Sequence, residues 1–214
     1  MTSTTLKILY LVHDLADPDI VGQFSRALAS VSGPRALILD LRDVSGGRPE
    51  YAYGVVGQLT AQPLPAPRRR MLLDRPAFEL LAQPESAATW YWLPPDTIRP
   101  ASGQTTYTGP LAVLSAATTA GAAEDLLAEV RGTARGVIIG SASAGSPGES
   151  FTTSIGNGWS VTLSAIDDAL PDGTSVPAAG LAPDVAVSQT VDEFLAGRDV
   201  VLQRAQAYLS AGTQ

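Results

Sequence analysis

The sequence predicts an α/β fold with a mainly parallel sheet flanked by helices. Short apolar runs, typical of strands covered on both faces, alternate along the chain with segments whose apolar residues recur at helical spacing. Such alternation of strand and helix is characteristic of α/β layers. The chain has 214 residues, of which 45% are hydrophobic, and this is enough to bury a sizeable core.

The first part of the chain shows the alternation most clearly. Ala36 begins an uninterrupted run of four apolar residues, which predicts a buried strand. Ile20, Phe24 and Leu28 recur at helical spacing, and Gly33-Pro34 ends that segment. The expected elements are a strand over 6–12, a helix over 20–31, a strand over 35–41 and a helix over 49–59.

Between residues 62 and 109, prolines such as those at 63, 65, 67, 94, 95 and 100 break any long element, so we expect irregular chain around short strands there. Regular structure resumes after this segment. The expected elements are a strand over 111–114, a helix over 119–130, a strand over 136–139, a Gly/Ser-rich loop over 140–148, a half-buried strand over 159–163 and a final helix over 196–209. We interpret residues 1–214 as one domain.

Charge and composition exclude several classes of function. Lys and Arg total 14 against 21 Asp and Glu, so the net charge of -7 disfavours a nucleic-acid partner. The absence of cysteine excludes disulfides, thiolate catalysis and cysteine-bound zinc, and a single histidine leaves no metal-ligand spacing. No stretch is long and apolar enough to span a bilayer, and the first residues do not resemble a signal peptide. We therefore expect a cytoplasmic protein with no membrane partner, metal or cofactor.

Four segments occur in one order along the chain and together carry a family resemblance. They read LILDLRDVSGG over 37–47, YTGPLAVLSAATTAGAAEDL over 107–126, GVIIGSASAGSPGE over 136–149 and PDGTSVPAAGLAPDVAV over 171–187. In this order they resemble the tail-specific (C-terminal-processing) peptidase family. The resemblance implies the stacked ββα units of the crotonase and Clp-protease superfamily, present here as a core domain without a PDZ module.

The double glycine Gly46-Gly47 directly follows a predicted buried strand. Glycine tolerates positive φ and has no Cβ, so the backbone can turn sharply there and approach a ligand. In the resembled family, one N–H of such a turn and the N–H after the nucleophile form an oxyanion hole. The resemblance therefore implies that Gly46 or Gly47 and Ala122, at a helix start, bind a ligand oxygen. The alternative is that the double glycine is only a tight turn.

The resemblance also implies that the catalytic groups are missing. Counting back three residues from Glu124 places the family's nucleophilic serine at Gly121. The general base of the serine–lysine branch falls at Ser146, and the glutamate of the other branch falls at Ser141. Covalent acyl transfer needs an activated nucleophile, and glycine has no side-chain oxygen or sulfur. An engineered Ser-to-Gly variant of an active serine peptidase is the alternative.

Other residues have weaker signals. His13 and Asp14 lie at the end of the first predicted strand, where they could act as acid and base or could be ordinary strand-end residues. Trp90 and Trp92, with Tyr91 between them, form either a wall over an apolar ligand or part of the core. Arg68-Arg69-Arg70 is interpreted as a solvated face, with the grip of a ligand carboxylate as the alternative.

Taken together, these features predict a peptidase-like protein that does not cut peptides. Its expected partner is a small apolar ligand with a carbonyl or carboxylate group, or a peptide, and an oligomer is compatible with the sequence. Two uses follow from the relatives: binding an apolar acid, as retinoid-binding homologues do, or a reaction through an enolate-like intermediate, as crotonase relatives perform. A scaffold without a ligand is the third alternative.

Overall fold

The computed structural model describes residues 6–10, 15–30, 36–72, 90–103, 105–145, 150–164 and 166–211. Its helices are α1 (Ile20–Ser30), α2 (Pro49–Val56), α4 (Ala122–Gly132), α5 (Val191–Leu195) and α6 (Val200–Ala211). Its strands are β1 (Leu6–Tyr10), β2 (Ala36–Asp40), β3 (Leu64–Pro65), β4 (Arg68–Leu72), β5 (Trp90–Trp92), β6 (Thr97–Ile98), β7 (Leu111–Ser115), β8 (Val137–Gly140), β9 (Ser150–Gly156), β10 (Trp159–Ser164), β11 (Ile166–Ala169) and β12 (Val185–Ala186).

A five-stranded parallel sheet forms the centre of the molecule, with the strand order β1-β2-β7-β8-β12. Its register places Leu39 opposite Val113, and Val113 in turn opposite Ile138. The predicted α/β class and parallel sheet are therefore confirmed. Parallel strands joined through helices place all their carboxyl ends at one edge, where sites in α/β folds form.

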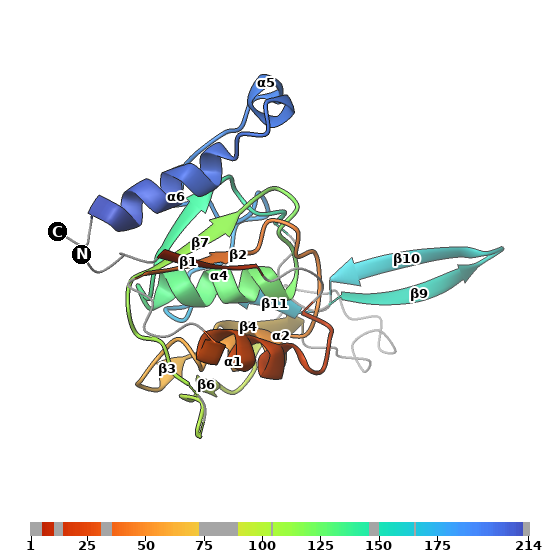
Figure 1. Ribbon diagram of the computed structural model, residues 1–214. Coiled ribbons are helices and arrows are strands. Elements are labelled where there is room, and N and C mark those ends of the chain that lie inside the picture. Colours follow the sequence, from red (N-terminus) through yellow and green to blue (C-terminus); the bar gives the residue numbers. More distant parts are fainter. Residues whose placement is uncertain are drawn as a thin grey trace, which may run out of the picture.

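Helices cover both faces of this sheet, as Figure 1 shows. Leu37 and Leu39 of β2 belong to the core cluster with α1, α2 and α4. Ala36 and Ile38 of the same strand belong to a second cluster, formed with α6 on the opposite face. This two-sided burial explains why the strand is an uninterrupted apolar run rather than an alternating one.

Where the structure describes the proline-broken middle of the chain, it forms short strands, as predicted. β4 pairs antiparallel with β5 and β11 in a separate three-stranded sheet, and β3 pairs with β6. The prediction of a half-buried strand over 159–163 is wrong about burial. β10 pairs only with β9 in the described structure, so Trp159 is 71% exposed and Leu163 is 47% exposed.

Two predicted helices differ at their boundaries. The helix expected from residue 119 begins at Ala122, because the Thr119 hydroxyl accepts the Ala116 N–H at 3.0 Å and Gly121 then turns with φ +60°. The final helix, expected over 196–209, is α6 and begins only at Val200, and a separate short helix, α5, precedes it. A capping box of Thr190 and Glu193 begins α5, and Gly197, with φ +67°, follows its end.

Arg42 ties α6 to the end of β2. Its guanidinium binds the Asp40 carboxylate at 2.6 Å and the Asp199 carboxylate, next to the start of α6, at 2.7 Å. The hydrogen bonds that Arg42 donates to the Asp40 carboxylate raise the pKa of Arg42, so its guanidinium remains charged. The neighbouring Asp43 makes no ion pair among the described residues, so this charge network consists of Asp40, Arg42 and Asp199. None of the described helices is long and apolar enough to cross a membrane.

Candidate active site

Loops that follow β2, β7 and β8 meet at the carboxyl edge of the parallel sheet. The Ala120 N–H donates to the Val44 carbonyl at 3.0 Å, which joins the loop after β7 to the loop after β2. The Ala144 N–H donates to the Thr119 carbonyl at 2.9 Å, which joins the loop after β8 to the same segment. Segments far apart in the sequence therefore form one backbone assembly at the edge where α/β proteins place their sites.

Gly121 lies at the centre of this assembly, as the N-cap of α4. A Cβ built on Gly121 would lie 3.3 Å from the Cα of Gly46. The structure thus brings Gly46, Gly121 and Ala122 together, although the double glycine and the helix start are far apart in the chain. The backbone of Gly121 has φ +60° and ψ -130°. A sharp strand-to-helix turn of this kind carries the nucleophile in α/β hydrolases.

Two backbone amides near this turn are available to a ligand. Among the described residues, neither the N–H of Gly46 nor the N–H of Ala122 donates a hydrogen bond. Ala122 is the first residue of α4, where the first amides lack an intrahelical acceptor and the helix dipole favours negative charge. These two donors are the groups that the sequence predicted for an oxyanion-type site.

Gly47 has a different role from Gly46. Its φ is +112°, and a Cβ there would lie 2.3 Å from the carbonyl carbon of Leu15. Leu15 and Gly47 form a parallel bridge, and the Arg48 N–H donates to the Leu15 carbonyl at 2.9 Å. Gly47 is therefore needed for the close approach of two backbone segments, and that approach positions Gly46.

A buried network from the first turn of α4 fixes the Gly/Ser-rich loop. Glu124 accepts hydrogen bonds from the Ser143 hydroxyl at 2.6 Å and the Gly145 N–H at 2.9 Å. The Ser143 hydroxyl also accepts the Leu181 N–H at 2.8 Å. The sequence analysis used Glu124 only to count residues and missed this role. A carboxylate three residues after a helix N-cap and close to a glycine loop was the available signal.

The comparison of sequence families decides the relationship. Residues 10–187 match Peptidase family S41. The chain belongs to peptidase family S41. The family inferred from the four collinear segments is therefore confirmed. No curated protein matches the sequence significantly.

Solved structures share the S41 fold at low sequence identity. A protein named as a candidate peptidase from Parabacteroides merdae superposes with a TM-score of 0.79 and 20% identity over 95% of this chain. Mature CPAF superposes with a TM-score of 0.72 and 17% identity over 97% of this chain. The photosystem II D1 C-terminal processing protease superposes with a TM-score of 0.61 and 19% identity over 86% of this chain. This S41 chain spans 61%, 50% and 42% of those three chains, respectively. At such identities, the likeness concerns the fold alone.

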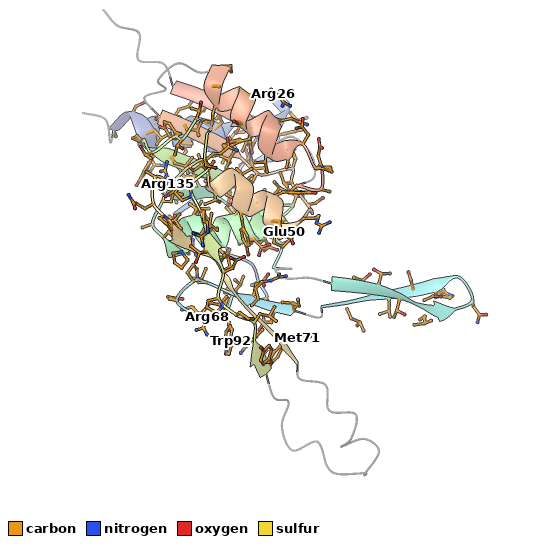
Figure 2. The ribbon with its side chains drawn as sticks, turned by 90° about the horizontal axis from the view of Figure 1, so that it is seen from below. Arg26, Glu50, Arg68, Met71, Trp92 and Arg135 are labelled. Atoms are coloured by element: carbon orange, nitrogen blue, oxygen red, sulfur yellow. The ribbon has the colours of Figure 1, made fainter. Side chains whose placement is uncertain are left out.

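Trp90 and Trp92 make their described contacts with arginines of the neighbouring strand β4. The guanidinium carbon of Arg68 lies 4.3 Å from the centre of the Trp92 ring, and both residues are labelled in Figure 2. The guanidinium carbon of Arg70 lies 4.5 Å from the centre of the Trp90 ring. No described contact brings Trp90 or Trp92 to Gly46 or Ala122. The interpretation of all three arginines as one solvated face is wrong for Arg69, because strand alternation turns it to the other face.

Three further predicted site residues, His13, Asp14 and Ser146, lie outside the described residues. Among the residues that the structure describes, no group of three or more acidic, histidine or cysteine side chains is arranged to hold a metal ion.

Behind the helix start, the S41 chain buries several carboxyl groups around one cation. Arg69 of β4 binds Asp168 of β11 at 3.2 Å, and Asp125 of α4 interacts with the same Asp168. Burial first, and then the charge of Asp168, raise the pKa of the Asp125 carboxyl. Burial and the charge of Asp125 also raise the pKa of the Tyr53 hydroxyl. A single arginine can compensate only one carboxylate, so this region favours protonated acids.

Glu129, one turn further along α4, gives this arrangement a measurable consequence. Its side chain is fully buried, and no hydrogen-bond partner within the described structure reaches either carboxyl oxygen. Burial raises the pKa of Glu129 from 4.5 to about 7. The folded state therefore holds this proton more tightly than the unfolded state does. The contribution of the protonated Glu129 to the free energy of unfolding is fully present below pH 4.5. This contribution is lost as the pH rises to about 7, by up to about 3 kcal/mol.

We expect Glu129→Gln to flatten this pH dependence, because glutamine keeps the shape of the neutral acid and does not ionise. Urea unfolding at a series of pH values between 5 and 8 measures the slope. Glu50→Gln is the matched control, since Glu50 lies on α2 with a side chain 61% exposed. Equal slopes for wild type and Glu129→Gln would show that Glu129 does not titrate in this range.

Proposed function

We propose that this S41 chain does not hydrolyse peptides and instead binds a small ligand with a carbonyl or carboxylate head and an apolar tail. The observation that carries the proposal is the close approach of two backbone segments. A Cβ at Gly121, where the resemblance places the nucleophile, would lie only 3.3 Å from the Cα of Gly46. The backbone that would present a nucleophile and hold an oxyanion is in place, and the nucleophile is not.

Neighbouring hydroxyl groups do not replace the missing nucleophile. Thr119 donates to the Leu41 carbonyl at 3.0 Å, Thr118 donates to the Arg42 carbonyl, and Ser115 donates to the Ser141 carbonyl at 2.8 Å. Ser143 is buried and donates to Glu124. Each of these hydroxyls has a backbone or carboxylate acceptor and serves to hold the loops. This supports loss of covalent chemistry rather than its transfer to another residue.

The same geometry supports binding of an oxygen with negative charge. The Gly46 and Ala122 amides belong to segments in contact, and one of them opens a helix of eleven residues. A hydrogen bond to a charged acceptor contributes on the order of 1.5–3 kcal/mol. A carboxylate, or a carbonyl that becomes an enolate, would use both donors. The two uses differ in chemistry but share this anchoring step.

Ala122 offers a sharp test of this proposal. Proline is tolerated at the first position of a helix, where it removes only the N–H that the ligand would use. We expect Ala122→Pro to weaken binding of a medium-chain fatty acid by roughly 10- to 100-fold, the equivalent of one hydrogen bond to a charged acceptor. Isothermal titration calorimetry with the acid, its alcohol and its thioester measures this change.

Ala122→Gly is the matched control, because it keeps the N–H and removes only the methyl group. Its affinity should remain close to that of wild type, and circular dichroism should confirm that both variants are folded. If the alcohol binds as well as the acid, or if Ala122→Pro binds unchanged, the oxyanion-type site is contradicted. A protein that binds none of the three compounds would support a scaffold without a ligand.

A further inference from the structure

The hairpin of β9 and β10, hereafter the ribbon (residues 150–164), stands apart from the body of the molecule. Figure 1 shows it extending beyond the helices and the sheet, and Figure 2 shows the same from below. Its sequence, SFTTSIGNGWSVTLS, contains no charged residue, although the whole chain carries a net charge of -7. A solvent-exposed arm normally carries charges that keep it soluble and prevent pairing of its edges.

The two faces of the ribbon differ in chemistry. Thr152 pairs with Thr162, and their hydroxyls lie 2.8 Å apart on one face. The pairing places Val161, Leu163 and Thr153, which lies opposite Val161, on the other face. Ile155 has no pairing partner, because the register shifts beside Trp159, and both residues lie near the tip of the ribbon.

These apolar side chains have no cover in the described structure. Ile155 is 66% exposed, Trp159 is 71% exposed and Leu163 is 47% exposed. β9 and β10 form a sheet of their own, so the described structure pairs neither outer edge. An isolated two-stranded hairpin is marginally stable in water, and a contiguous exposed apolar face marks an interaction surface.

We infer that the ribbon is an arm through which two copies of this chain associate, apolar face against apolar face. In a two-fold dimer the same patch meets itself, so any charge near the axis would face its own copy and repel it. A patch with no charge avoids that repulsion between two chains that are each acidic. The distance of the ribbon from the body lets two arms approach while the acidic bodies stay apart.

A strand-like peptide added to the ribbon edge is a different partner, and the observations favour it less. Such a peptide would satisfy the edge amides and leave Ile155, Trp159 and Leu163 exposed to water. Face-to-face packing of two ribbons buries Val161 and Leu163 and leaves the Ser/Thr face toward solvent. The dimer therefore accounts for the difference between the faces, which edge pairing does not explain.

Neighbouring residues on opposite faces give the test. Sedimentation velocity on the full chain over a range of concentrations should show a reversible dimer. Leu163→Lys should weaken the dimer by at least about tenfold, because it puts like charges into an apolar contact. Thr162→Lys, which adds the same charge on the opposite face, should leave the association unchanged.

Val161→Lys provides a second variant on the same face as Leu163 and should match Leu163→Lys. Circular dichroism should show that both variants are folded, and sedimentation velocity should show that they are monomers. A wild-type chain that remains monomeric at high concentration overturns the inference. Equal weakening by Leu163→Lys and Thr162→Lys, or by neither, also overturns it, because only an apolar-face contact distinguishes them. This test does not depend on whether a ligand binds at Ala122.

Discussion

Gly47→Ala is expected to lower the free energy of unfolding by more than about 3 kcal/mol, among the largest effects of any single substitution. The added Cβ would lie 2.3 Å from both the carbonyl carbon and the Cβ of Leu15, and φ is +112°. Neither segment can move aside without breaking the hydrogen bond from Arg48 to Leu15. Urea unfolding measures the loss, and failure of the variant to fold would agree with it.

Gly103→Ala is the control that separates the strain of a positive φ from the steric contact of an added Cβ. Gly103 also has a positive φ, +71°, but a Cβ there would meet no atom within 4 Å. Its cost should be that of the backbone conformation alone, about 1–2 kcal/mol. If Gly47→Ala and Gly103→Ala lower the free energy of unfolding by the same amount, the close packing of Gly47 against Leu15 does not contribute to stability.

The central fold could be predicted from the sequence because burial on both faces gives a distinctive signal. Ala36 to Leu39 and Leu111 to Leu114 are continuous apolar runs, and both are strands of the parallel sheet. The ribbon shows the limit of this reasoning. Trp159, Val161 and Leu163 alternate as they would in a half-buried strand, because alternation depends on the backbone and not on whether a partner covers the apolar face.

The candidate site could be predicted in part, through family resemblance rather than local pattern. Gly46 and Gly121 were expected to lie together because their segments match the family in order, and the structure places them in contact. The buried pair of Arg69 and Asp168 could not be foreseen. It depends on the antiparallel register between β4 and β11, which joins residues far apart in the chain and has no signal in either segment alone.

Gly121→Ser should not produce a peptidase. The new Cβ would make a tight contact with the Gly46 Cα at 3.3 Å, and φ +60° is strained for serine at a cost of about 1–3 kcal/mol. A small shift of the turn would relieve the contact, so we expect the variant to fold with reduced stability. Its hydroxyl would lack an activating base, because the position where the resembled family has that base is occupied here by Ser146. Cleavage of casein at a robust rate by Gly121→Ser would instead favour an inactivated serine peptidase.

The central claim, that this S41 chain retains the backbone of a peptidase site without its nucleophile, is tested most directly by covalent labelling of the unmodified chain. A fluorophosphonate probe reacts with an activated serine, and intact-mass spectrometry counts the labels. We predict no labelling and no hydrolysis of casein, while the same probe labels an active serine peptidase in parallel. Stoichiometric labelling of any serine in this chain would contradict the account.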